Sequence, residues 1–332
     1  MSPVEEASVA VATGNLEQQL EGQRKALTGF CYRMLGSPFE AEDAVQETLL
    51  RAWRSYDQFE GRSTLRSWLF RIATNVCLDM VKGRERRALP MDFGPAREPI
   101  EANLHTRPEV TWIEPIMDSA LAGESDPAEV AVAHETIRLA FVAALQHLPP
   151  RQRAVLILCE VLRWQASEVG QLLDTSVASV NSALQRARAT LASIDISPED
   201  ATPITDVSQR RLLERYVTAF QEYDLSALTA LIQKDARQSM PPFDMWLSGR
   251  GDILAWMYGP GIGCRGSRLL PVPTTNGTAA FGQYKPSVSG SGLEPWSLQV
   301  IEFRHGEIVE FTFFLDTARL FPLYGLPARL DG

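Results

Sequence analysis

The chain has 332 residues, 45% hydrophobic and 22% charged, a composition typical of a globular protein with two or three domains. A formal net charge of −9 argues against a protein that coats nucleic acid through its overall charge. The apolar runs are shorter than the ~20 residues of a membrane-spanning helix, and the acidic N-terminus lacks a signal-peptide pattern. We therefore expect a cytoplasmic protein without membrane contact. Its four widely spaced cysteines predict reduced thiols, and no cofactor or metal-ligand spacing is present.

The N-terminal part of the chain is predicted to be helical. Residues 1–14 are expected to be disordered, and residues 15–88 are expected to form a first all-α domain with almost no proline. Its apolar positions recur at helical spacing over 16–35, 39–55 and 64–87. Gly36-Ser37-Pro38 breaks the chain between the first two helices.

Two proline-rich and acidic stretches divide the remainder. Residues 92–129 hold nine acidic residues and two arginines, so we expect a flexible acidic linker over 89–126. Residues 127–193 form a second all-α domain, and residues 194–205 form a second linker.

From residue 206 to residue 332 the pattern changes to that of an α+β domain. Helices are expected over 207–223 and 225–234 and near 252–258. Alternating strands follow over 268–272, 279–284, 298–304 and 308–314, and His305-Gly306 closes the last hairpin.

The first all-α domain (residues 15–88) combines aromatic with basic residues, the two kinds of side chain that a surface for single-stranded DNA requires. Phe59, Trp68 and Phe70 offer rings on which unpaired bases can stack, although Trp68 is expected in the core. Basic side chains that can neutralise phosphates accompany them: Arg62, Arg66, Arg71, Lys82, Arg84, Arg86 and Arg87.

The sequence of the second all-α domain (residues 127–193) predicts a helix-turn-helix. Residues 165–173 form its first helix, Asp174-Thr175 the turn, and residues 176–191 the recognition helix, with Ser176 as N-cap. Val177, Val180 and Leu184 are predicted to face the core. The residues predicted to face outward carry groups that can bond to bases or phosphates: Ser179, Asn181, Ser182, Gln185, Arg186 and Arg188.

The segments DAVQETLLRAW (43–53) and GRSTLRSWLFRIATNVCLD (61–79), followed by a basic run, resemble the extracytoplasmic-function group of bacterial sigma factors in order and spacing. The resemblance implies binding to the RNA polymerase core through its β′ and β subunits, recognition and melting of a promoter −10 element by the first domain, and −35 recognition by the helix-turn-helix. It assigns the polymerase contact to Asp43, Gln46, Glu47, Leu50 and Arg51. It places Phe59–Arg66, including Ser63 and Thr64, around a flipped base, and it lines the −10 face with Arg71, Asn75 and Asp79. Many relatives carry basic residues where this chain has Asn181 and Ala183, which predicts weak autonomous DNA binding.

The last domain resembles the SnoaL-like, ketosteroid-isomerase-like cone fold in its element order, in LLERYVTAFQEYDLSALTALI and in the hairpin VIEFRHGEIVEFTFFLD. In some relatives such a domain modulates sigma activity. A pocket that takes an unknown small ligand is expected to involve Trp246, Trp256, Phe281 and Trp296. Met240, Phe243, Met245 and Met257 are further candidates for its lining. Asp244, His305 and Asp316 are ionisable candidates, but a regulatory role is favoured over a catalytic one.

Two other interpretations of the protein's function stay open. One is a small-molecule enzyme or ligand-binding SnoaL-like protein fused to a helix-turn-helix regulator, and the other is a conventional repressor or activator. The aromatic and basic residues of the first all-α domain favour a sigma factor, because neither alternative function needs a domain that melts DNA.

Overall fold

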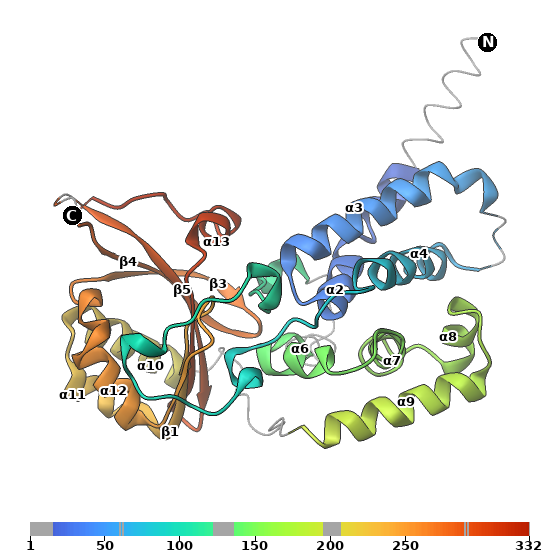
Figure 1. The fold of residues 1–332 in the computed structure, drawn as a ribbon. Helices are drawn as coiled ribbons and strands as arrows, with labels where there is room; N and C mark the ends of the chain where they lie inside the picture. Colours follow the sequence, from blue (N-terminus) through green and yellow to red (C-terminus); the bar gives the residue numbers. More distant parts are fainter. Residues whose placement is uncertain are drawn as a thin grey trace, which may run out of the picture. The chain divides into compact units, whose positions relative to one another are not determined.

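The computed structural model describes residues 16–59, 61, 63–121, 136–194, 207–288, 290 and 292–331. They form two compact units. The helical unit holds residues 16–86, 120–121, 136 and 144–194, and the C-terminal unit holds residues 87–119, 137–143 and 207–331. Figure 1 follows the chain through both. Two predicted segments lie outside the described residues. They are the N-terminal residues 1–14, which are expected to be disordered, and the second linker (194–205) from residue 195 onward.

The first half of the helical unit contains the helices α2 (Arg24–Leu35), α3 (Pro38–Arg54) and α4 (Leu65–Met80), and residues 16–21 before them are also helical. Gly36 ends α2 in the left-handed region, with φ 75°, and its N–H donates to the Tyr32 carbonyl. Ser37 then caps α3, with Pro38 at the first helical position. The Phe30 and Phe70 rings pack edge to face, 5.4 Å apart, in the core.

The third helix is shorter than predicted. It ends at Met80 instead of continuing to residue 87, and Gly83 takes a φ of 76°. Glycine adopts this conformation without strain, and the residues beyond it present no apolar face to the core. The basic run 82–87 therefore lies on irregular backbone.

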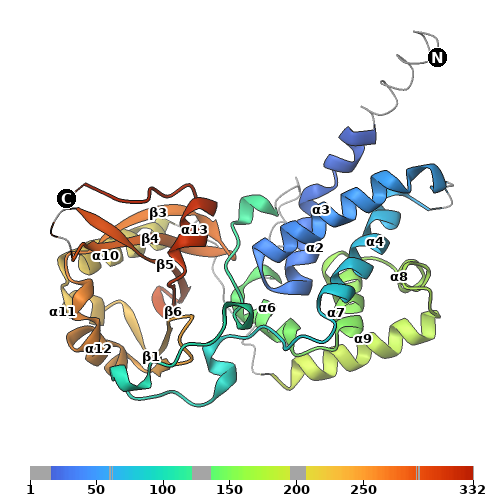
Figure 2. The ribbon, with the colours of Figure 1, turned by 45° about the horizontal axis from the view of Figure 1, so that its top comes forward.

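The second half of the helical unit contains the predicted helix-turn-helix. Helix α6 (Leu139–Gln146), of which residues 144–146 belong to this unit, is followed by α7 (Pro150–Leu156), a π-helical turn η6 (Ile157–Val161), α8 (Ala166–Leu172) and α9 (Val177–Ala192). Ser176 caps α9, as predicted, by accepting a hydrogen bond from the Ser179 N–H. Gly170 lets α8 and the turn approach, because a Cβ there would lie 2.9 Å from the Thr175 carbonyl oxygen. Figure 2 shows α7 and α8 beside α4, and α9 packs against α7 and α8.

The C-terminal unit is built on a six-stranded sheet in the order β2-β1-β6-β5-β4-β3. Its strands are β1 (Ile232–Ser239), β2 (Trp246–Ser248), β3 (Arg268–Thr275), β4 (Thr278–Pro286), β5 (Leu293–Arg304) and β6 (Glu307–Phe314). Strands β1 and β6 are parallel, and the other neighbours are antiparallel. His305 and Gly306 both have positive φ, which fits the tight hairpin predicted there.

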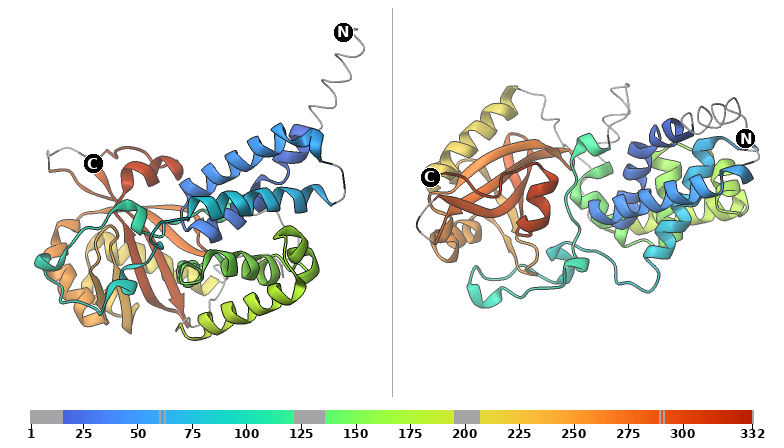
Figure 3. Two further views of the ribbon diagram at one scale, coloured as in Figure 1. Left: turned by 45° about the vertical axis from the view of Figure 1, so that its right-hand side comes forward. Right: turned by 90° about the horizontal axis from the view of Figure 1, so that it is seen from above.

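Helices pack on the curved sheet to form the expected α+β cone. They are α10 (Val207–Glu222), α11 (Leu225–Thr229), α12 (Arg250–Tyr258), the 3-10 turn η7 (Pro260–Cys264) and α13 (Thr317–Leu323). Figure 3 shows α10 to α12 gathered along the sheet. The core includes Tyr216, Leu228, Ile301 and Phe311. The predicted helix over 225–234 was wrong in its second half, because Ile232 already pairs with Ile308 in the sheet.

The segment 89–119 is ordered, so the expectation of a flexible linker was wrong for this part. It forms short 3-10 turns at Pro90–Phe93, Glu101–Asn103 and Glu109–Thr111, and it belongs to the C-terminal unit. We call residues 87–119 the strap. Its backbone pairs with the domain at several points, including Arg97 N–H to the Trp246 carbonyl at 3.0 Å and Asp244 N–H to the His105 carbonyl at 2.9 Å.

Candidate functional sites

The outer face of α3 carries a stripe of exposed side chains. Asp43, Gln46 and Leu50 lie at i, i+3 and i+7, and Trp53 extends the stripe by a further turn. Leu50 is 48% exposed and Trp53 54% exposed, although both are large and apolar. Glu47 and Arg51 lie beside the stripe and form an ion pair of 2.6 Å. An apolar centre with polar neighbours on a rigid helix is suited to docking on another protein.

The loop before α4 and one face of α4 form a second exposed surface. Ser63, Thr64 and Arg66 are exposed, and Thr64 caps α4 by accepting from the Ser67 N–H at 3.1 Å. Arg62 lies outside the described residues. Arg71, Asn75 and Asp79 are exposed at i, i+4 and i+8, so they share one face of the helix.

Three aromatic rings pack together at the base of this loop. Phe59 lies 5.0 Å from Trp68 and 6.0 Å from Tyr56, measured between ring centroids. All three are half-buried, so Trp68 is less deeply buried than predicted. Tyr56 was not predicted to belong to this cluster, although its position three residues before Phe59 could have indicated the pairing.

The basic run divides into exposed and buried residues. Lys82, Arg84 and Arg86 are exposed. Arg87 is only 6% exposed; its guanidinium donates to the Trp112 carbonyl and lies 3.6 Å from the Glu114 carboxylate. The assignment of Arg87 to DNA binding was therefore wrong, because strap residues occupy its charged head.

On the recognition helix α9, all six side chains predicted to face outward are exposed: Ser179, Asn181, Ser182, Gln185, Arg186 and Arg188. The guanidinium of Arg188 pairs with Glu160, and that of Arg186 donates to Ser182 Oγ at 2.7 Å. The core side of α9 differs from the prediction. Val180 and Ala187 are buried, whereas Val177 is 45% exposed. Val177 is the first residue of the helix and lies beyond the edge of the core.

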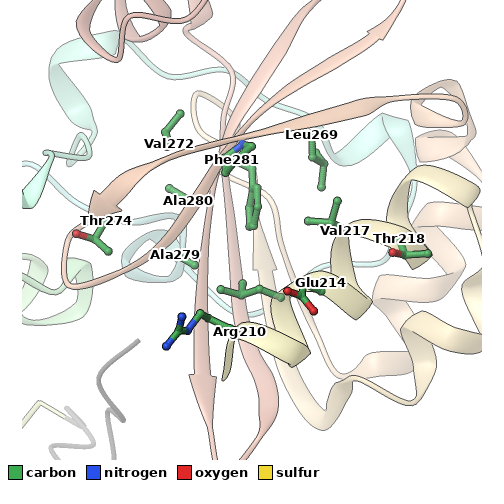
Figure 4. Close-up of a pocket in the computed structure, with 12 residues that line it drawn as sticks. Arg210, Glu214, Val217, Thr218, Leu269, Val272, Thr274, Ala279, Ala280 and Phe281 are labelled. Atoms are coloured by element: carbon green, nitrogen blue, oxygen red, sulfur yellow. The ribbon is translucent and has the colours of Figure 1, made fainter. Parts of the chain in front are cut away.

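The structure separates the four residues expected to share a pocket. Trp256 and Trp296 line one cavity of about 220 Å³ in the cone. Phe281 lines a second cavity of about 480 Å³ between α10 and strands β3 and β4, where Figure 4 shows it with Leu269 and Val217. Trp246 is half-buried, and its indole N–H donates to the Gly94 carbonyl of the strap. Met240 and Met257 join the first cavity.

Two of the three ionisable candidates of the C-terminal domain, Asp244 and Asp316, are engaged in ion pairs. Asp244 is 6% exposed and lies 3.3 Å from each of Arg97 and Arg107, both from the strap. His305 is an exposed hairpin residue. Asp316 precedes α13, as expected of a cap, but its carboxylate lies 3.5 Å from Arg319.

Within the described residues, one group of three carboxylates is close enough together to hold a metal ion: Glu109, Glu114 and Asp316. The Arg319 guanidinium contacts all three. This cluster is therefore an ion-pair network that ties the strap to α13. None of the helices in the described part of the chain combines the length and the apolar character needed to cross a membrane.

Comparisons with known proteins match two segments of the chain to known domain families. Residues 21–87 match the model of sigma-70 region 2, and residues 138–191 match that of sigma-70 region 4. The chain is 42% identical to the ECF RNA polymerase sigma factor SigG of Mycobacterium tuberculosis (strain ATCC 25618 / H37Rv) over 325 residues, 96% of this chain and 85% of that protein. SigW of Bacillus subtilis (strain 168) is 28% identical over 48% of this chain and 78% of its own.

A solved structure has the same fold over most of the chain. The crystal structure of Mycobacterium tuberculosis extracytoplasmic function sigma factor SigJ superimposes with a TM-score of 0.59 at 21% identity, covering 90% of this chain and 96% of that one. Together with the SigG identity, the two region matches settle the family. The chain belongs to the extracytoplasmic-function sigma factors, which direct RNA polymerase core enzyme to specific promoters and initiate transcription there.

Proposed function

We propose that the separate surfaces described above bind polymerase, the −10 element and the −35 element. We also propose that the C-terminal domain inhibits transcription initiation by this sigma factor. The α3 stripe docks on polymerase, the loop before α4 and the Arg71 face take the −10 element, and α9 reads the −35 element. The support is that the side chains of the α3 stripe, of the Arg71 face of α4 and of the outer face of α9 are exposed on capped helices, and that Ser63, Thr64 and Arg66 are exposed beside α4.

Sequence reading and general DNA affinity are expected to depend on different residues. Gln185→Ala on α9 should cost about 1–3 kcal/mol at one base pair of the upstream element, because a bidentate amide contact is lost. Lys82→Ala should weaken binding to every promoter alike and reduce the slope of log K against log salt by about 0.9, since one phosphate contact is lost. Binding to promoter variants by the polymerase holoenzyme at several salt concentrations measures both. Equal, uniform losses in the two variants would contradict the division.

The strap is the observation that carries the proposed restraint. Region 2 and region 4 touch within the helical unit, where the Phe70 and Trp164 rings lie 5.2 Å apart. Promoter elements at −35 and −10 are roughly 25 base pairs apart, or about 85 Å at ~3.4 Å per base pair. The two regions must therefore separate to engage both elements, and the segment that joins them must extend.

The C-terminal domain holds that segment by buried, charge-assisted contacts. Asp244 binds Arg97 and Arg107, and Arg319 binds two strap carboxylates. Further along, Asn276 is 1% exposed and accepts from the Ile116 N–H at 2.9 Å. Each of these contacts must break before this stretch can extend, so the domain favours the closed arrangement.

The same contacts favour a regulatory domain over a catalytic one. The carboxylate best placed to act as a buried base, Asp244, is already engaged by two guanidinium groups, those of Arg97 and Arg107. In this proposal its function is to hold the strap.

Release of the strap is expected to raise activity. Asp244→Asn removes the charge that Arg97 and Arg107 face, which should free this part of the strap and increase promoter-specific transcription by about threefold or more. The measurement is multi-round transcription with reconstituted holoenzyme, together with protease sensitivity of the strap. Asp235→Asn is the matched control, because it changes the same charge on an exposed position of β1. Increased strap cleavage without any rise in transcription would contradict the restraint.

A further inference from the structure

The smaller cavity of the C-terminal domain is built from several elements of the cone. Its lining residues come from strands β1, β4, β5 and β6 and from α10, α12, the η7 turn and the residues next to them. All of its lining residues belong to the C-terminal unit. Its volume of about 220 Å³ exceeds the ~150 Å³ of a cavity that accepts benzene, so it suits one aromatic ring with substituents.

Half of the lining residues are aromatic or carry a thioether. Trp256, Trp296 and Phe313 contribute rings, and Met240 and Met257 contribute flexible sulfur-containing chains. Aromatic faces favour a flat apolar ligand, and methionine adapts to its edge.

One buried polar group in this lining points to a ligand. Gln238 on β1 is 2% exposed, and its Oε1 accepts no hydrogen bond from any described residue. Leaving a buried amide oxygen unpaired is costly, whereas a ligand hydroxyl or N–H would satisfy it.

The neighbouring glutamine shows the contrast. Gln283 is fully buried on β4, where its Oε1 accepts from Ser297 Oγ at 2.8 Å and from Gln299 Nε2 at 2.9 Å. Its Nε2 donates to Ser267 Oγ at 3.0 Å. The domain therefore pairs Gln283 internally, while Gln238 keeps an acceptor for another molecule.

A positive charge also lines the cavity. The ammonium of Lys285 lies 3.5 Å from the centroid of the Trp296 ring, and its side chain is 21% exposed. Its nearest carboxylate, Glu294, is 4.0 Å away, at the limit of an ion pair. A partly desolvated lysine with so distant a partner favours an anionic group on the ligand.

The remaining ionisable groups in the lining are neutral. Burial raises the pKa of the Cys264 thiol, which keeps it protonated at neutral pH. Burial also raises the pKa of Tyr223 to about 12, and its hydroxyl donates to the Met257 carbonyl at 2.6 Å. Tyr223 thereby anchors the chain beside η7, and the lining offers no activated nucleophile for covalent chemistry.

We propose that this cavity binds a small phenolic acid, with the hydroxyl donating to Gln238 Oε1, the ring against Trp256 and Trp296, and the carboxylate at Lys285. The hydroxyl supplies the donor that the buried amide lacks, and the carboxylate supplies the charge that Lys285 faces. The two tryptophans select a planar ring.

The test is calorimetric titration of the full chain with three probes of increasing length: 4-hydroxybenzoate, 4-hydroxyphenylacetate and 3-(4-hydroxyphenyl)propanoate. We expect at least one to bind with a Kd between roughly 10 µM and 1 mM. The matched acid without the hydroxyl should bind about ten- to a hundredfold more weakly, because the amide oxygen then stays unpaired. Absence of binding by all three at 10 mM would overturn the proposal.

Variants locate the site. Gln238→Met should remove the preference for the hydroxyl, and Lys285→Met should weaken the acids about tenfold while leaving 4-ethylphenol unchanged. Val217→Ala, in the larger cavity, should leave every affinity as it was. Binding that responds to Val217→Ala and not to the other two changes would place the probe in the larger cavity and overturn the assignment.

Thermal unfolding without ligand distinguishes a binding role of Gln238 from a structural one. Gln238→Met replaces an amide whose buried oxygen is unpaired with an apolar chain of similar length, so we expect Tm to rise by about 2–4 °C. A fall in Tm would show that the amide supports the fold, and it would contradict the proposal.

Discussion

Leu50→Asp is expected to reduce promoter-specific transcription at least a hundredfold while leaving the fold unchanged. Leu50 is 48% exposed on the outer face of α3, between the polar pair Asp43 and Gln46 and the exposed Trp53. If this stripe docks on polymerase, the substitution removes an apolar anchor and buries a charge, which together cost about 3 kcal/mol or more. Affinity for core polymerase and transcript yield both measure the effect.

The matched control for this change is Val288→Asp at an exposed turn of the C-terminal domain, where Val288 is 94% exposed. It should keep full affinity for core polymerase. Circular dichroism should show equal helicity in both variants, because neither residue packs in the core. Unchanged core affinity of Leu50→Asp would remove the α3 stripe from the polymerase interface.

The helical domains were predictable because their signals are local. Ser176 before an apolar period fixed the start of α9, and Gly36-Ser37-Pro38 fixed the break between α2 and α3. The strand pattern after residue 268 was equally clear, since His305-Gly306 sits between two alternating runs. In each case the residues that decide the structure are neighbours in the chain.

Features that depend on distant partners were not predictable in this way. Arg87 looks like its basic neighbours until Trp112 and Glu114 bury it. The strap has the composition of a flexible linker, yet Asp244 and Arg319 hold it in place. Residues after Ala230 continue a helical period, but pairing with β6 outweighs this weak propensity.

For the same reason, only two of the four predicted pocket residues line one cavity together. The tryptophans of this domain indicated an apolar lining, and Trp256 and Trp296 do line one cavity. Sequence alone could not show that Trp246 pairs with the strap, or that Gln238 is the polar group in the lining.

Arg153→Met is expected to lower the Tm of the helical unit by about 6–12 °C. Arg153 is 4% exposed and meets the last carbonyls of two helices. It donates to the Met34 carbonyl at the end of α2, and to the carbonyls of Gln146 and Leu148 at and just beyond the end of α6, the last two at 3.1 and 3.2 Å. Burial lowers the pKa of Arg153 to about 10, so it stays charged at pH 7, where the negative ends of two helix dipoles stabilise it. Methionine fills the volume but leaves these acceptors unpaired, at about 3 kcal/mol.

The same substitution should also loosen region 2 from region 4, because the guanidinium joins α2 of one to α6 and α7 of the other. Fluorophores on α3 and α9 of the full chain should therefore lie farther apart on average in Arg153→Met. Arg153→Lys should fall between this variant and the wild type, since a single ammonium keeps the charge without the planar fork. Arg151→Met, two residues earlier on the same helix and exposed, is the control and should change neither Tm nor the label distance. If Arg151→Met and Arg153→Met gave the same distance, the buried guanidinium would not be what holds the two promoter-binding regions together.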